Sequence, residues 1–265
     1  MRRFDHAFVI PAYGESLHIE ACIASLAGQR GAPSRMVIAT STPSAFLEQI
    51  AARHRLPLAV NPVRAGIGGD WNFALATADA DWVTIAHQDD LYRDDYLDAM
   101  DAALAPHPDA LIAFSDYDEI DPDGPRPDHI NLRVKRRLCR RAFGDRDAIR
   151  TPAEKRRLLA WGNPVCCPSV AIHRSAIPDF HFGVELRSNL DWEGWLNLAD
   201  CAGAFVYVRE PLVTRRIHPA SETTAVIADE GRLAEDRIMF QRMWPAPVAA
   251  LILAVYRAGY LANRT

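Results

Sequence analysis

The chain has 265 residues, of which 49% are hydrophobic, and this length suffices for one large α/β domain or two small ones. Its formal net charge of −4 argues against general nucleic-acid binding. The chain leads from Met1 into a short strand, and no apolar run reaches the ~20 residues of a membrane helix. We therefore expect neither a signal peptide nor a membrane span. The five cysteines show no CxxC spacing, which predicts reduced thiols in a cytoplasmic protein.

The first half of the sequence alternates short apolar runs with amphipathic segments. Strands are expected at residues 7–12, 36–40, 58–60, 82–86 and 110–114. Helices are expected between them, with Ser16, Ser44 and Asp94 as N-caps of the first, second and fourth, and with Trp71, Ala74, Leu75 and Ala78 as the apolar stripe of the third. Repeated β–α units with short connections predict an α/β fold with a Rossmann-like, doubly wound and mostly parallel sheet.

The second half of the sequence is less regular. A turn-rich stretch at residues 121–125 leads into a basic run, which contains Arg133, Lys135, Arg136, Arg137, Arg140 and Arg141. This basic run is either a solvated helix face or a contact for a phosphorylated acceptor or an anionic membrane surface. Strands are then expected at residues 169–173, 204–209 and 213–217, and helices at about 189–199, 230–243 and 247–262, the first of them capped by Asn189.

The most informative motif is the tetrapeptide His87-Gln88-Asp89-Asp90, which follows a strand that we expect to be buried. Adjacent carboxylates repel each other and are costly to desolvate unless a positive group lies beside them. Mg²⁺ and Mn²⁺ prefer oxygen ligands, and a site with one or two carboxylates leaves positions for phosphate oxygens. A solvated loop that caps the next helix is the other interpretation. Ligands bind beyond the carboxyl ends of parallel strands, where Tyr13, Thr40 and Asn61 are also expected, so these residues plausibly line one crevice.

Four segments together resemble the family 2 glycosyltransferases of the GT-A fold. Residues 9–15, Val-Ile-Pro-Ala-Tyr-Gly-Glu, are similar to the family's first strand and nucleotide-binding loop. Residues 61–90 resemble its second block, which contains Trp-Asn-x-Ala-Leu and ends in the acidic metal motif. Residues 189–196 resemble the segment of the catalytic base, and residues 216–223 resemble the C-terminal signature near the diphosphate. The resemblance is specific because the four segments occur in the family's order over nearly the whole chain.

The resemblance implies an inverting enzyme that moves a sugar from a nucleoside diphosphate to an acceptor hydroxyl with the help of Mn²⁺ or Mg²⁺. It implies a UDP, dTDP or GDP sugar as donor and a glycan or lipid-linked acceptor, as in polysaccharide biosynthesis. It also divides a single GT-A domain into a nucleotide-sugar-binding half at residues 1–120 and an acceptor and catalytic half at 121–224. C-terminal helices follow at 225–265.

The same resemblance gives each candidate residue an expected role. Asp191 is the general base, at the start of a helix whose dipole favours an ionised carboxylate. The expected metal ligands are Asp89, Asp90 and His218, while the residues expected near the diphosphate are His87, Arg215 and Arg216. The residues expected to bind the nucleotide are Pro11, Ala12, Tyr13, Glu15, Thr40, Asn61, Gly66, Asn72, Gln88 and Asp89.

Three positions depart from the family's pattern. His87 stands where the acidic motif usually begins with Asp, so we expect it to be a polar support for a metal site that persists on the two carboxylates. Thr40 and Ser41 replace an Asp pair, one of which usually contacts uracil, and this leaves the identity of the base open. Leu190 replaces a Glu, but the Asp that follows it is kept.

Two other classes of protein fit parts of the sequence. A sugar nucleotidyltransferase shares the strand–helix alternation and the metal, but it normally has a glycine-rich loop with Arg or Lys after its first strand, and residues 11–16 contain no basic side chain. A GT-A protein that binds a nucleotide sugar without turnover fits the departures just described. The basic run and the apolar residues 248–256 fit either a peripheral contact with the inner face of a membrane or a solvated basic face and a packed final helix.

Overall fold

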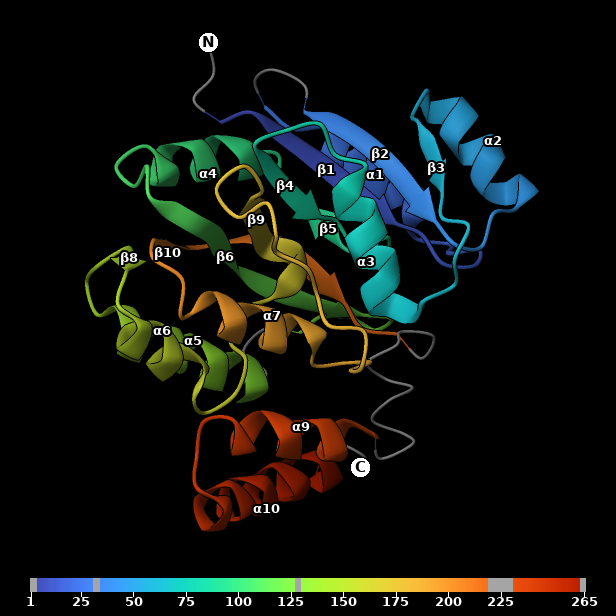
Figure 1. Cartoon of the computed structure of the whole chain (residues 1–265). Helices are drawn as coiled ribbons and strands as arrows, with labels where there is room; N and C mark the ends of the chain where they lie inside the picture. The colour runs from blue at the N-terminus through green and yellow to red at the C-terminus, as the bar shows by residue number, and fades with distance from the viewer. Residues whose placement is uncertain (1–3, 31–33, 127–129, 219–230, 263–265) are drawn as a thin grey trace.

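The computed structural model describes residues 4–30, 34–126, 130–218 and 231–262. Its centre is one mixed sheet with the strand order β3-β2-β1-β4-β9-β6-β10-β5. Helices cover both faces of this sheet, and α9 and α10 form a pair at one end of the molecule (Figure 1). Within the described residues, no helix combines the length and the hydrophobicity that are needed to span a bilayer.

The sheet is mostly parallel. Its strands are β1 (His6–Pro11), β2 (Arg35–Thr40), β3 (Leu58–Val60), β4 (Trp82–Ile85), β5 (Leu91–Tyr92), β6 (Ala110–Asp121), β7 (Gly124–Pro125), β8 (Ala148–Ile149), β9 (Val170–His173) and β10 (Ala204–Arg216). The strands β3, β2, β1 and β4 pair in parallel, and so do β6 and β10. Because β9 lies antiparallel between β4 and β6, the direction of β6 is again that of β4. The carboxyl ends of both parallel groups therefore meet at one edge of the sheet, where ligands bind in folds of this kind.

Two hydrophobic cores lie on the two faces of the sheet. The helices are α1 (Ile19–Ala27), α2 (Ala45–His54), α3 (Gly66–Ala76), α4 (Tyr96–Leu104), α5 (Ile130–Phe143), α6 (Pro152–Leu159), α7 (Leu190–Leu198), α9 (Gly231–Gln241) and α10 (Ala246–Ala262), with a 3₁₀ turn at Cys167–Ser169. On β1, Phe8 and Ile10 join the core under α1, α2 and α4, whereas Val9 joins the core that contains residues of α3, α5, α6, α7, α9 and α10. This division follows from the two-residue alternation of side chains along a strand.

The C-terminal helix pair is attached to the second core by aromatic side chains. The rings of Trp192 on α7 and Phe240 on α9 pack edge to face with centroids 5.2 Å apart. The indole of Trp244 donates to the Ala160 carbonyl (2.7 Å), and the Tyr256 hydroxyl donates to the Trp161 carbonyl (2.7 Å). The last two helices are therefore fixed to α6 and α7, next to the segment of the expected catalytic base.

The structure confirms the predicted alternation and corrects some of its boundaries. Ser44 caps α2 by accepting the Leu47 N–H (3.3 Å). Ser16 does not cap α1, because that helix begins after His18. Asp94 does not cap α4 either, because the helix begins at Tyr96 with Asp95 in the N-cap position, and the Asp94 carboxylate pairs with Arg30 (2.9 Å).

The two strands that we expected at residues 204–209 and 213–217 are the single strand β10. Its pairing with β6 shifts register between Val208 and Pro211 and again between Pro211 and Val213. Proline cannot donate a ladder hydrogen bond, but a bulge lets the strand continue past it.

Candidate active site

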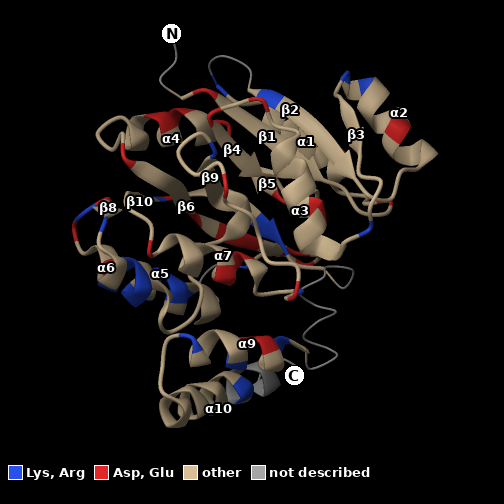
Figure 2. Cartoon of the chain, in the orientation of Figure 1, with Lys and Arg blue, Asp and Glu red and all other residues tan. Residues whose placement is uncertain are grey.

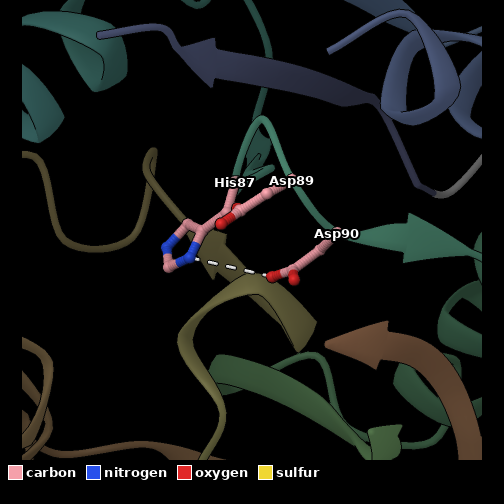
Figure 3. Close-up of side chains that lie close together, drawn as sticks. All are labelled: His87, Asp89 and Asp90. Atoms are coloured by element: carbon pink, nitrogen blue, oxygen red, sulfur yellow. Dashed lines mark ion pairs between the residues drawn. The ribbon is translucent and has the colours of Figure 1, made fainter. Parts of the chain in front are cut away.

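The acidic tetrapeptide lies directly after β4, at the carboxyl edge of the sheet. The Ala86 N–H donates to the Val9 carbonyl (2.8 Å), which extends the pairing with β1. The Asp90 N–H then closes a turn on the His87 carbonyl (3.2 Å). This turn brings ligand atoms of His87, Asp89 and Asp90 within 4.8 Å of one another (Figure 3).

Asp90 is the most buried member of this group, with 1% of its surface exposed. One carboxylate oxygen accepts the Arg216 N–H (2.8 Å). The other oxygen lies 3.8 Å from His87 Nδ1 and has no hydrogen-bond partner among the described residues. Burial raises the pKa of Asp90 well above its usual range, the neighbouring Asp89 raises it further, and Arg215 and Arg216 oppose the rise. A nearby cation would relieve both the desolvation and the repulsion.

His87 completes a donor set that suits a divalent cation. Its ring packs against Trp71 with centroids 5.1 Å apart. Burial lowers the pKa of His87 to about 4, although Asp89 favours the charged form, so the imidazole is neutral near pH 7. Within the described part of the chain its buried Nε2 has no hydrogen-bond partner. Neutral imidazole is a common metal ligand, and carboxylate oxygens favour Mg²⁺ or Mn²⁺, so these residues fit such an ion.

The end of β10 closes over the acidic loop. His218 Nε2 lies 2.8 Å from Asp89 Oδ2, and Arg216 Nε donates to the Asp89 carbonyl (3.0 Å). Together with the backbone bond to Asp90, these contacts fix both carboxylate residues from one strand end. The metal contact of His218 and the diphosphate contact of Arg216 stay predictions, since both side chains here touch the loop itself.

Arg215 links the acidic loop to the expected base. Its guanidinium pairs with Glu119 on β6 (3.6 Å). Its positive charge acts against the raised pKa values of both Asp90 and Asp191, and it adds to the lowering of the pKa of His87. One cation therefore acts on the candidate metal site and on the candidate base, which places the two in one electrostatic neighbourhood.

The loop after β1 is tied to the acidic loop by Gln88. The Tyr13 N–H donates to Gln88 Oε1 (3.3 Å), and Gln88 Nε2 donates to the Tyr13 carbonyl (3.2 Å). Ala12 is buried and Pro11 half-buried, while Glu15 is exposed. The Tyr13 side chain itself is 67% exposed, so an aromatic ring is freely presented beside the acidic loop.

A carboxylate that sequence reasoning missed lies at the end of β2. Asp70, on α3, accepts hydrogen bonds from Ser41 Oγ (2.8 Å) and from Asn61 Nδ2 (3.2 Å). Thr40 instead accepts the Thr42 N–H (3.0 Å) within its own loop. Although no Asp follows β2 in the sequence, the carboxylate of Asp70 on α3 lies beside Ser41 at the end of that strand. Only its place near the start of an otherwise apolar helix could have drawn attention to it.

Two expected nucleotide-binding residues have structural roles on α3. Gly66 begins the helix with a φ of 73°, a conformation that favours glycine. Asn72 donates through Nδ2 to the Phe182 carbonyl (2.8 Å) and accepts the Phe182 N–H at Oδ1 (2.7 Å). In this structure both ends of the Asn72 amide bind the backbone of a distant loop, and its nucleotide contact stays a prediction.

Asp191 is the second residue of α7 and is half-buried. One carboxylate oxygen accepts the Trp192 N–H (2.7 Å), and the other accepts Asn163 Nδ2 (2.9 Å). Burial raises the pKa of Asp191, although Arg232 and the Trp192 N–H oppose the rise. The helix dipole favours the ionised carboxylate that we expected, while burial shifts the pKa of Asp191 in the opposite direction, upward from its ordinary value. A raised proton affinity suits a general base.

Two acidic residues of α9, which the sequence did not reveal, hold the segment in front of Asp191. Glu235 accepts the N–H groups of Arg187, Ser188 and Asn189 and the Ser188 hydroxyl at distances between 2.7 and 2.9 Å. Burial alone would raise the pKa of Glu235. These hydrogen bonds lower it by more, so the pKa lies below its ordinary value. Asp236 accepts Asn189 Nδ2 (2.8 Å), so Asn189 occupies the N-cap position of α7 without making the expected cap bond.

Solved structures show the same arrangement of sheet and helices. The S. aureus TarS 1-349 structure in complex with UDP-GlcNAc matches with a TM-score of 0.65 and 17% identity, over 95% of this chain and 71% of that one. The mannosyltransferase PcManGT from Pyrobaculum calidifontis, in complex with GDP-Man and Mn²⁺, matches with a TM-score of 0.64 and 18% identity, over 97% of this chain and 76% of that one. The protein therefore has the GT-A glycosyltransferase fold.

The sequence profile described as Glycosyl transferase family 2 matches residues 7–179. This is more than half of the chain, and the chain belongs to that family. No curated protein sequence matches it significantly.

Proposed function

We propose that this protein is an inverting glycosyltransferase that moves a sugar from a nucleoside diphosphate to a hydroxyl of a glycan or lipid-linked acceptor. The observation that carries the proposal is the group of His87, Asp89 and Asp90 at the carboxyl edge of the sheet, in which one buried oxygen of Asp90 and the buried Nε2 of His87 have no hydrogen-bond partner among the described residues. The charge of Arg215 acts against the raised pKa of both Asp90 and Asp191, which connects this group electrostatically with the candidate base. Glycosyl transfer needs these two functions together, because a leaving diphosphate must be stabilised while an acceptor hydroxyl loses its proton.

Asp89, Asp90 and His87 would hold the divalent cation. Bound Mn²⁺ or Mg²⁺ would neutralise the negative charge that develops on the leaving diphosphate. The protein's own contribution is to fix the donor set, which it does through the bonds of Arg216 and His218 to the loop. Fixed groups need no reorganisation during the reaction, which is the advantage of a preorganised site.

Asp191 would act as the general base. Its carboxylate takes the proton of the acceptor hydroxyl while the acceptor oxygen forms its bond to the anomeric carbon. The bond from that carbon to the donor phosphate oxygen breaks, and its electron pair leaves with the diphosphate. Because attack and departure occur on opposite faces of the sugar, the configuration inverts. Asn163 (2.9 Å) and the Trp192 N–H (2.7 Å) each donate to one oxygen of Asp191, and the second lone pair of each oxygen is left to the substrate.

The donor side would recognise the nucleotide through Tyr13 and the group formed by Asp70, Ser41 and Asn61. An exposed aromatic ring can stack on any base. Ser41 donates its hydroxyl proton to Asp70 (2.8 Å), so its oxygen is left to accept from a ring N–H of the base. This arrangement suits UDP, dTDP or GDP as the nucleotide, and the similar solved structures hold UDP-GlcNAc and GDP-Man.

The direct test is to measure nucleoside diphosphate release from UDP-, dTDP- and GDP-sugars with and without Mn²⁺. We expect release that needs the metal and is lost in EDTA. A protein that binds a nucleotide sugar but releases no nucleotide with any donor would instead be the binding protein without turnover. Release of pyrophosphate from a nucleoside triphosphate and a sugar phosphate would identify a nucleotidyltransferase.

A further inference from the structure

A cavity of about 610 Å³ lies between α5 and the middle of β10. Its lining includes Arg133, Arg136, Arg137, Arg140, Arg209 and Tyr207. None of the residues that line it belongs to the candidate active site described above. Blue Lys and Arg segments gather along α5 and α6 (Figure 2). The basic run of the sequence is thus divided between this cavity and the rest of the helix surface.

Two of the arginines are already occupied by protein groups. Arg136 pairs with Asp116 (2.6 Å), which is the acidic member of the lining, and with Asp118 (2.9 Å). Arg209 donates to the carbonyls of Gly144 (2.8 Å) and Arg146 (2.9 Å). The only carboxylate in the lining is therefore neutralised by its own partner, and the remaining positive charge is not compensated from within the cavity.

Arg133, Arg137 and Arg140 make up that uncompensated charge. Their spacing of four and three residues places them on one face of α5. All three are exposed, and among the described residues none of them makes a hydrogen bond or an ion pair. The helix α5 itself, Ile130–Phe143, contains no acidic residue that could pair with them.

The neighbouring arginines show that this is not the general pattern of the surface. Arg146 pairs with Glu154 (2.5 Å), Arg150 with Asp109 (2.9 Å) and Arg156 with Asp200 (2.5 Å). These three arginines outside the cavity therefore have acidic partners, as the lining residue Arg136 does, whereas Arg133, Arg137 and Arg140 have none among the described residues. Three guanidinium groups without a partner in the described part of the chain line one cavity and are available to an anion from solution.

The shape and chemistry of the cavity define the class of anion. Guanidinium groups bind phosphate through paired, charge-assisted hydrogen bonds, and three of them suit a group with several acceptor oxygens. Ile130 and Val134, which are 65% and 50% exposed, also line the cavity. An apolar segment attached to the phosphate would find contact there. A cavity of this volume exceeds what a simple inorganic ion fills.

We propose that this cavity is a binding site for a phosphate-bearing ligand, which Arg133, Arg137 and Arg140 hold by its phosphate oxygens. The ligand carries a phosphomonoester or a diphosphate, presented either by a soluble molecule or by the headgroup of a lipid. The site is separate from the donor site and does not depend on the proposed transfer reaction.

The test compares two double variants of the full chain with matched loss of charge. Arg133→Gln with Arg137→Gln removes two lining arginines. Arg141→Gln with Arg157→Gln removes two exposed arginines that do not line the cavity and have no ion pair within the described residues. Calorimetric titration with inorganic pyrophosphate is done in EDTA, which keeps a metal-dependent donor site out of the measurement. Melting temperatures check the fold, and Arg140→Gln serves as a second lining variant.

We expect saturable pyrophosphate binding to the wild type, weakened about tenfold or more in the lining variants and unchanged in the control. Flotation with phosphatidylcholine vesicles that contain graded phosphatidic acid, whose headgroup is a phosphomonoester, separates the sources. Vesicle binding that needs Arg133 and Arg137 identifies a lipid headgroup, and pyrophosphate binding without vesicle binding identifies a soluble ligand. Absence of both, or equal weakening in the lining and control variants, overturns the proposal.

Discussion

The acidic loop and the segment that carries Asp191 are held in place by different means. The acidic loop is anchored by the backbone of the central sheet, through β4 on one side and the end of β10 on the other. The segment in front of α7 is anchored by the side chains of Glu235 and Asp236, which come from the C-terminal helix α9. The comparison indicates that the position of the candidate metal site depends on the sheet, whereas the position of the candidate base depends on the helix α9.

The largest loss of activity is expected from a substitution in the acidic loop, which the sheet anchors. Asp89→Ala should lower transfer by more than ~10³-fold, because one ligand of the candidate metal site is lost where leaving-group charge develops. The fold should persist, since the Asp89 side chain makes one hydrogen bond among the described residues, to His218, while its backbone carbonyl still accepts from Arg216. Transfer assays in Mn²⁺ and a melting curve measure both. Asp94→Ala, which breaks only the exposed pair with Arg30, is the control, and near-normal transfer by Asp89→Ala would contradict the metal site.

A substitution of Asp191, in the segment that α9 anchors, should lower the rate of transfer without changing the affinity for the donor. Asp191→Asn should retain the donor nucleotide but lose transfer by ~10²-fold or more, which is the usual contribution of a general base. Titration of the donor nucleotide and single-turnover rates measure the two properties separately. An Asp191→Asn protein with normal turnover would remove this residue from the mechanism.

The raised pKa of Asp191 predicts the acidic limb of the pH profile. The base works only when it is deprotonated, so kcat/KM should fall as the pH drops through the pKa of Asp191. Because burial raises that pKa, the limb should lie above the value of about 3.9 for an ordinary Asp. The rate should fall tenfold for each pH unit below it. The residual activity of Asp191→Asn is the reference, and a limb that persists there unchanged would assign the titration to another group.

A smaller loss of activity is expected when Glu235, which anchors the segment before α7, is changed. Glu235→Gln keeps the shape but loses the charge that accepts four hydrogen bonds, so stability should fall by about 1.5–3 kcal/mol. The value of kcat should fall several-fold while donor affinity is kept, because only the base segment is loosened. Glu48→Gln, an exposed change on α2, is the control.

The pH dependence of that stability loss has a definite sign. The folded pKa of Glu235 is lowered, so its contribution is complete above the unfolded value of about 4.3 and is lost as the pH falls through the folded value. The stability difference between wild type and Glu235→Gln should therefore shrink below that pH. A constant difference down to the acid transition would mean that packing, and not charge, anchors the segment.

The difference between the acidic loop and the segment before α7 also explains which parts of the site can be predicted from the sequence. The acidic loop and the strands beside it are coded by contiguous residues, so the apolar run at Trp82 and the motif that follows it were enough to place them. The N-cap Ser44 was likewise predictable because its partner Leu47 is three residues away. Glu235 and Asp70 were not, because their partners lie on other elements and no local pattern connects them.

Burial by remote segments also sets properties that no local sequence rule gives. The dipole of α7 favours an ionised Asp191, but the upward shift of its pKa comes from surroundings that are assembled only in the fold, among them Asn163 and Arg232. Asn72 matches the family motif in sequence, yet its amide is occupied by Phe182. In both cases the residue type was informative, and its environment is set only by the fold.

The central claim is that the acidic loop forms a metal-dependent site for a nucleoside diphosphate, and a binding panel tests it without knowledge of the acceptor. The melting temperature of the wild type and of Asp89→Ala is measured with UDP, GDP, dTDP and CDP, each with and without Mn²⁺. A ligand that binds only the native state raises the melting temperature in proportion to its affinity. We predict a rise with at least one nucleotide that requires Mn²⁺ and disappears in Asp89→Ala. The same rise without Mn²⁺, or its persistence in Asp89→Ala, would contradict the account.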